Sequence, residues 1–184
     1  MTPSARASLR SAPPIWAMAP GLRRLATRQG AAPRLAPTWP CHQLDDPSPA
    51  GYAAQLASCA GALAGVEEVA APLSAAGRAF ALDDLHAMGQ PEAFVFAPVW
   101  LIIRLDGSLH LTLRPEWAQK VAAKGWGTVH PFARYMAGAV PPQSLVIYTP
   151  RDSHELAVVA RIIAAAHCYA SGRIGEVALP DSRW

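Results

Sequence analysis

The amino-acid sequence predicts a small α+β domain, with helices packed on one face of an antiparallel sheet. Alternating apolar residues on both sides of an Asp-Gly pair indicate a β-hairpin at the centre of the fold. Two stretches with helical features follow, at 115–124 and 152–172. The chain has 184 residues, of which 52% are hydrophobic, and this suits a single domain with a core of its own.

Residues 1–50 differ in composition from the rest of the chain. Six of the sixteen basic residues lie in the first forty positions, where there is no acidic residue, and nine prolines stand between Pro3 and Pro49. Such a segment can bury little apolar surface, so we predict a disordered Pro/Arg-rich tail. A mis-assigned start, a mitochondrial presequence and a tail that contacts anionic lipid or nucleic acid non-specifically are the alternatives.

Residues 51–184 form the predicted domain, which begins with a helix and a strand. Gly51–Val69 is rich in alanine and is the expected helix, although Gly61 and Gly65 each disfavour a helix by about 1 kcal/mol relative to alanine. Arg78–Leu82 is a short strand candidate, and 83–89 is expected to form a turn.

The hairpin strands are Val99–Leu105 and Leu109–Leu113, joined by Asp106-Gly107. A two-residue loop would place Ile103 opposite His110 and Leu101 opposite Thr112, and opposed residues share a face of the sheet. In that register the leucines of the second strand face the helices, together with Trp100, Ile102 and Arg104, whereas His110 and Thr112 face the other side.

Two helices and one strand complete the prediction. Pro115 suits the first position of a helix that ends near Gly125. Residues 125–142 are expected to form a loop, and Leu145–Tyr148 a strand. In the last helix Asp152 is the expected N-cap, with Glu155 three residues later, and Gly172 marks the end.

Three runs resemble a family of small proteins catalogued as the "luciferase domain": DGSLHLTL, RPEWAQKVAAKGWGTVHPFA and SLVIYTPRDSHELAVVARIIAAAHCYASG. The resemblance covers roughly Val66–Gly172. It implies a small α+β fold and, from the family label, an oxidoreductase of the monooxygenase kind that acts on an organic substrate. The layout is also similar to the YjbR and TfoX-type domains, by analogy of fold alone.

The resemblance is incomplete before the Asp-Gly turn. The family pattern has histidines there in a His-x-His arrangement, and this chain has Ile102 and Arg104 at those positions. If those histidines bind a metal or take part in chemistry, this chain lacks that contribution. His110 and His130 match the family motif and are present.

His110 and His130 are therefore the candidate catalytic residues, and Arg104, Thr112 and Trp126 are candidates for ligand binding. Each also has a purely structural interpretation. His110 would be a hydrogen-bonded histidine on a half-exposed sheet face, His130-Pro131 part of a turn, and Arg104 a side chain that reaches water near the hairpin tip. Aromatic residues at these spacings usually belong to a core.

Other classes of function have little support in the sequence. No phosphate-binding loop, nucleophile elbow or dinucleotide fingerprint is present, and the sequence leaves any cofactor unknown. Cys41-His42 has no partner pair for a metal site. Beyond the first forty residues ten basic residues stand against thirteen acidic ones, which argues against a specific nucleic-acid partner. No apolar run is long enough to span a membrane, and three irregularly spaced cysteines favour the cytoplasm.

Two hypotheses remain open. The first is a binding module, without catalysis of its own, whose sheet face around His110, Thr112 and Trp126 holds a small molecule or a partner. The second is a luciferase- or monooxygenase-type enzyme with His110, His130 and Arg104 at its site. A homo-oligomer is compatible with both.

Overall fold

The computed structural model describes residues 22–72, 75–135 and 140–173. Within these ranges the chain forms six strands and three α-helices, and every paired strand is antiparallel to its neighbour. The sheet has the order β1-β2-β3-β4-β6-β5. The strands are β1 (Val66–Val69), β2 (Gly77–Leu82), β3 (Val99–Arg104), β4 (Leu109–Thr112), β5 (Gly127–Val129) and β6 (Ser144–Ile147), and the helices are α1 (Tyr52–Gly61), α2 (Pro115–Ala123) and α3 (Ser153–Ala170). The predicted α+β class is confirmed.

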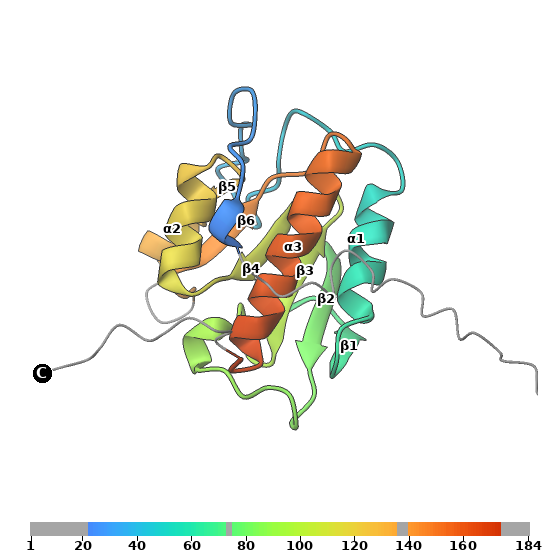
Figure 1. The fold of residues 1–184 in the computed structure, drawn as a ribbon, viewed down its shortest axis with the longest axis vertical. Helices are drawn as coiled ribbons and strands as arrows, with labels where there is room; N and C mark the ends of the chain where they lie inside the picture. The colour runs from blue at the N-terminus through green and yellow to red at the C-terminus, as the bar shows by residue number, and fades with distance from the viewer. Residues whose placement is uncertain (1–21, 73–74, 136–139, 174–184) are drawn as a thin grey trace, which may run out of the picture.

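The three helices cover one face of the sheet, and α3 crosses in front of β3 and β4 between α1 and α2 (Figure 1). Leu101, Leu109 and Leu111 point to this side and belong to one buried core with Val159 and Ile163 of α3. Helix α3 begins as predicted, because the side chain of Asp152 accepts a hydrogen bond from the backbone N–H of Glu155 at 2.8 Å.

Two segments differ from their sequence prediction. The helix expected over 51–69 ends at Gly61, and a turn that contains Gly65 leads into the edge strand β1. Gly65 has a φ of 72°, which side chains other than glycine rarely adopt, so the helix cannot continue through it. The loop expected over 125–142 contains the short strand β5, which pairs with β6.

The hairpin register is shifted by one residue from the predicted one. Ile103 lies opposite Leu109 and Ile102 lies opposite His110, because the loop has three residues, 105–107, with Gly107 at a φ of 83°. The backbone N–H of Arg104 donates to the carbonyl of Ser108 at 2.9 Å and closes this loop. The prediction that Ile102 and Arg104 share the face of the leucines is therefore wrong: both lie on the face of His110.

The predicted disordered tail spans residues 1–50, of which 1–21 lie outside the described residues. The remaining part packs against the domain. Leu22 and Leu25 are buried in the helix-side core, and Arg28 pairs with Glu155 of α3 at 3.5 Å. Cys41 is fully buried. Residues 22–50 therefore add a layer to the fold, and part of it covers the sheet face opposite the helices.

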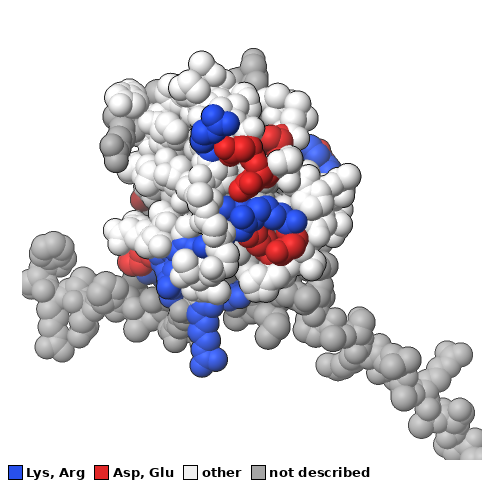
Figure 2. Space-filling view, turned by 90° about the horizontal axis from the view of Figure 1, so that it is seen from above, with Lys and Arg blue, Asp and Glu red and all other residues white. Residues whose placement is uncertain are grey.

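The charged surface has no broad region of one sign on the face seen in Figure 2, where basic and acidic side chains lie side by side. Among the described residues, Arg34 pairs with Asp45 at 2.9 Å and Arg151 pairs with Glu155 at 2.5 Å. No helix in the described ranges has the length and apolar character that crossing a membrane requires.

Candidate functional site

The sheet face opposite the helices carries a buried polar cluster. Arg104 stands at the end of β3, His110 lies in β4, and His130 follows β5 and caps a short 3-10 helix, Pro131–Arg134. Their exposed fractions are 2%, 1% and 0%. Buried arginine and histidine are uncommon unless they are well paired, so the contacts of each group decide what the cluster can do.

The two histidines are stacked. Their ring centroids are 4.3 Å apart and the ring planes meet at 28°. Burial, together with the positive charge of Arg104, lowers the pKa of His130 to about 4. Burial, followed by the charges of His130 and Arg104, holds the pKa of His110 well below its usual 6.5. Both imidazoles are therefore neutral at pH 7, and each then has one nitrogen able to accept a hydrogen bond or a proton.

Arg104 is a buried cation with poor neutralisation. Nη1 donates to Ser108 Oγ at 3.2 Å, and Nη2 lies 3.3 Å from Nε2 of His130. Among the described residues no carboxylate forms an ion pair with it, and its Nε has no hydrogen-bond partner. Burial lowers the pKa of this guanidinium to about 10, which is opposed by the charge of Asp106.

His130 cannot neutralise Arg104 well. Its Nδ1 faces the backbone N–H of Phe132 at 3.3 Å, while its Nε2 faces the guanidinium at the same distance. A neutral imidazole has only one acceptor nitrogen, so both contacts cannot be good hydrogen bonds at the same time. The cluster therefore offers more hydrogen-bond donors than it satisfies.

Further polar atoms on this face also lack partners. Nε2 of His110 and Oγ of Ser144 are buried and unpaired among the described residues. Ser144 lies opposite Thr112 in the β4–β6 pairing, so it shares the face of His110. Thr112 itself is engaged, because its hydroxyl donates to the carbonyl of Ala93. The unpaired atoms supply donors and acceptors for an oxygen-rich group bound at this face.

Aromatic rings close the cluster. The Trp39 ring lies 5.4 Å from His130 and 6.1 Å from His110, measured between ring centroids, and Phe96 and Phe132 are each 6.1 Å from Trp39. Cys41 is fully buried near Arg104, and burial raises the pKa of its thiol, which is therefore neutral at pH 7. The site thus has an apolar cover over a cationic and polar floor, which strengthens electrostatic interactions inside it.

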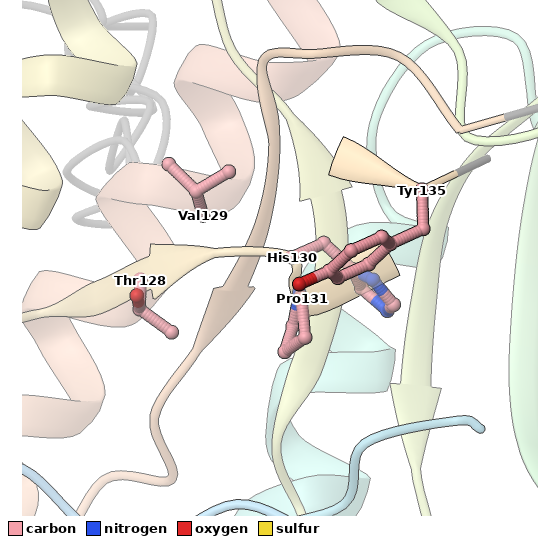
Figure 3. A pocket seen from close by; sticks show the side chains of 5 residues that line it. All are labelled: Thr128, Val129, His130, Pro131 and Tyr135. Carbon is pink, nitrogen blue, oxygen red and sulfur yellow. The ribbon is translucent and has the colours of Figure 1, made fainter. Parts of the chain in front are cut away.

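A surface hollow of about 360 Å³ borders the cluster on the β5 side. Its lining residues are Thr128, Val129, His130, Pro131 and Tyr135. Figure 3 shows Tyr135 and Pro131 next to His130, with Thr128 farther along β5. His130 therefore belongs both to the buried cluster and to the lining of this hollow.

Three of the five residues singled out in the sequence come together here: Arg104, His110 and His130. Thr112 lies on the same face with its hydroxyl already bonded. Trp126 is buried in the helix-side core, and its indole N–H donates to the carbonyl of Ala26 at 2.7 Å, so it is not part of the cluster. The interpretation of Arg104 as a side chain that reaches water is wrong, because it is 2% exposed.

Sequence reasoning missed Trp39, Cys41, Ser108 and Ser144. The first two lie in a segment whose composition suggests disorder, and no local pattern ties them to the sheet. Ser108 follows the Asp-Gly pair, where its hydroxyl donates to Asp106 at 2.7 Å. Among the described residues no group of three or more His, Cys, Asp or Glu side chains is arranged to hold a metal ion.

Comparison with known proteins shows that Arg104, His110 and His130 lie in a segment that matches a protein family. Residues 100–166 match the family model described as Luciferase domain. Proteins named Luciferase from Armillaria ostoyae, Armillaria gallica and Neonothopanus nambi are 44%, 42% and 36% identical to this chain over 64 residues. That segment is 35% of this chain and 24% of each relative, so the match spans about a quarter of the relatives' length.

No solved structure matches the chain. The family segment contains Arg104, His110 and His130, whereas Trp39 and Cys41 lie outside it. The resemblance to the luciferase domain family is confirmed for residues 100–166, which include β4, α2, β5 and β6 and most of β3 and α3.

Proposed function

We propose that this protein is a small-molecule binding module whose ligand is an organic anion held by Arg104. The observation that carries the proposal is the burial of the guanidinium without an ion pair among the described residues. A buried charge without a partner destabilises a fold, so its presence is better explained by a ligand than by stability. Arginine suits carboxylate, enolate or phosphate oxygens, which its planar donor fork can bind in pairs.

The surrounding groups fit an anion better than a cation. His110 and His130 are neutral, and Nε2 of His110 and Oγ of Ser144 can each donate or accept a hydrogen bond. No carboxylate of the described residues pairs with Arg104, so a ligand anion would meet little competition. The aromatic cover excludes water and would strengthen the contact with the guanidinium.

A panel of organic anions tests this proposal. The full chain is heated with carboxylates, enolates and phosphate monoesters at constant ionic strength, and the unfolding temperature is compared with that of the same protein without the anion. A ligand present at a hundred times its Kd stabilises the folded state by about 2.7 kcal/mol. Native mass spectrometry of the purified chain reports any bound mass and the oligomeric state.

Two arginine variants make the test specific. Arg104→Met should lose the response to the anion. Arg78→Met removes the same charge from the exposed pair with Glu68 and should keep the response. The proposal fails if no anion of the panel binds, or if both variants respond as the unaltered chain does.

The alternative is a luciferase- or monooxygenase-type oxidoreductase that acts on an organic substrate. The names of the fungal relatives support it, since all are called Luciferase. In such an enzyme Arg104 would hold the oxyanion of the substrate, and His110 or His130 would accept a proton from it. The alternative is favoured if an anion that binds also causes oxygen uptake, and if His110→Asn loses the oxygen uptake but still binds the anion. Binding of an anion without oxygen uptake or light emission favours the binding module.

A further inference from the structure

Residues 35–43 form a short loop over the candidate site, which we call the strap. Its two ends are joined, because Leu35 and Gln43 form an antiparallel bridge and the N–H of Ala36 donates to the carbonyl of His42 at 2.8 Å. The N–H of Cys41 donates to the carbonyl of Thr38 at 2.7 Å and closes the far end. The strap is therefore a compact unit with Trp39, Pro40 and Cys41 at its tip.

The tip covers all three charged or imidazole groups of the site. Trp39 packs on His110 and His130, and the carbonyl of Pro40 forms a hydrogen bond with the ring of His130. Cys41 is fully buried near Arg104. With the strap in this position Arg104, His110 and His130 are at most 2% exposed, so the cluster is closed to solvent on the side of the strap.

The strap is fastened chiefly at its base. The N–H of Gln43 donates to the carboxylate of Asp106, and the side-chain carbonyl of Gln43 accepts from the N–H of Thr149 at 3.1 Å. The amide nitrogen of Gln43 also reaches the carbonyl of Asp45 at 2.7 Å. Among the described residues, the backbone–backbone hydrogen bonds of the strap stay within the strap and its two flanking residues. The tip has no backbone–backbone hydrogen bond to the described part of the sheet; the hydrogen bond between the Pro40 carbonyl and the His130 ring, the ring contacts of Trp39 and buried side chains hold it in place.

We propose that the strap is a lid, which opens about its base at Gln43 and carries Trp39 and Cys41 away from the site. The identity of the ligand that enters through the opening rests on the proposed function, according to which an anion binds Arg104. The opening itself does not depend on it. A unit with its own internal hydrogen bonds, whose tip meets the sheet through side chains and not through backbone pairing, can open locally at lower free energy than the whole fold.

The reactivity of Cys41 measures the opening directly. The chain has three cysteines, all free, so Cys59→Ala with Cys168→Ala leaves Cys41 as the only thiol. This protein is treated with iodoacetamide at pH 8.5, and the rate of alkylation is followed by mass spectrometry over a series of urea concentrations below the unfolding transition. Local opening exposes little surface, so its rate should change little with urea, whereas global unfolding has a steep dependence.

Two tryptophan variants complete the design. Trp39→Ala removes four ring contacts at the tip and should raise the alkylation rate at least about tenfold, since each aromatic pair contributes roughly a two- to tenfold change in an equilibrium. Trp39→Phe is a milder version for the case that the alanine variant folds poorly. Trp117→Ala is the matched control: Trp117 is partly buried on the helix side, away from the strap, and its loss should leave the rate unchanged.

The outcomes separate the lid from the ligand. A rate that is nearly independent of urea and is raised by the Trp39 variants alone supports the lid. A rate that follows global unfolding, or rises equally in Trp117→Ala, overturns it. The alkylation experiment contains no anion, so its result is valid even if no anion of the panel binds. Equally, a strap that does not open locally would not change the result of the anion panel.

Discussion

Replacing Arg104 by methionine should stabilise the protein, although it removes a charged residue from the centre of the candidate site. Methionine has a similar length and no charge. Burial lowers the pKa of Arg104 from the ordinary value of a guanidinium to about 10. At about 1.36 kcal/mol per pH unit, this difference corresponds to about 3 kcal/mol by which the folded state disfavours the charged group.

Part of that gain is lost again. The variant gives up the hydrogen bond from Nη1 to Ser108 Oγ at 3.2 Å, which contributes about 1 kcal/mol net. The contact with His130 is weak for the reasons given above. The expected result is a stabilisation of about 1–2 kcal/mol, and each kcal/mol raises the unfolding temperature of a chain of this size by about 2–4 °C.

Urea unfolding of the two proteins, followed by tryptophan fluorescence, measures this difference. Arg28→Met serves as the comparison, because Arg28 is equally buried but pairs with Glu155 at 3.5 Å. That variant should be destabilised by about 1–3 kcal/mol, since it leaves a buried carboxylate with one partner fewer. If Arg104→Met destabilises the protein as Arg28→Met does, Arg104 is a structural residue and the argument for a ligand collapses.

Three further predictions concern the site and its frame. The free energy of unfolding should fall as the pH drops from 6.5 towards 4, because His110 and His130 bind protons in the unfolded chain but stay neutral in the folded one. Urea titrations at each pH measure this dependence, and His130→Asn should make it shallower. An unchanged slope in the variant would contradict the direction of the pKa shift. Gly107→Ala should cost about 1–2 kcal/mol in urea unfolding, since Gly107 has a φ of 83° and a Cβ there would lie 3.2 Å from Ser48; no loss would argue against the three-residue loop. Asp152→Ala should cost about 1 kcal/mol through loss of the α3 cap, and a neutral result would remove that role.

The hairpin shows how far local sequence patterns reach. Asp106-Gly107 correctly marks the turn, and the alternation around it correctly marks two strands. The pattern cannot decide between a loop of two residues and one of three, because Gly107 suits a positive φ in either. That choice shifts the register by one residue and moves Arg104 from the leucine face to the face of His110. The pairing of Arg104 with the histidines therefore depends on a detail that the sequence leaves open.

The strap shows a second limit. Its prolines and the arginines around it are typical of segments that bury little surface, and Trp39 and Cys41 have no apolar pattern about them. Their positions result from contacts with residues 55–100 positions away along the chain, such as His130 and Arg104. The prediction that Trp126 binds a ligand failed for a different reason. Trp126 lies within the family segment, directly before β5, but its side chain is buried in the helix-side core, where the indole N–H donates to the carbonyl of Ala26.

The central claim is that the cluster of Arg104, His110 and His130 binds an anion, and histidine NMR tests it most directly. The ring nitrogens of all six histidines are labelled with ¹⁵N, and spectra are recorded at pH 6 with and without the anion of the panel that raises the unfolding temperature most. We predict that His110 and His130 are neutral in both spectra and that their signals, and not those of the other four, shift on binding. Signals that stay fixed at these two residues while the anion binds, or shifts confined to other histidines, would contradict the account.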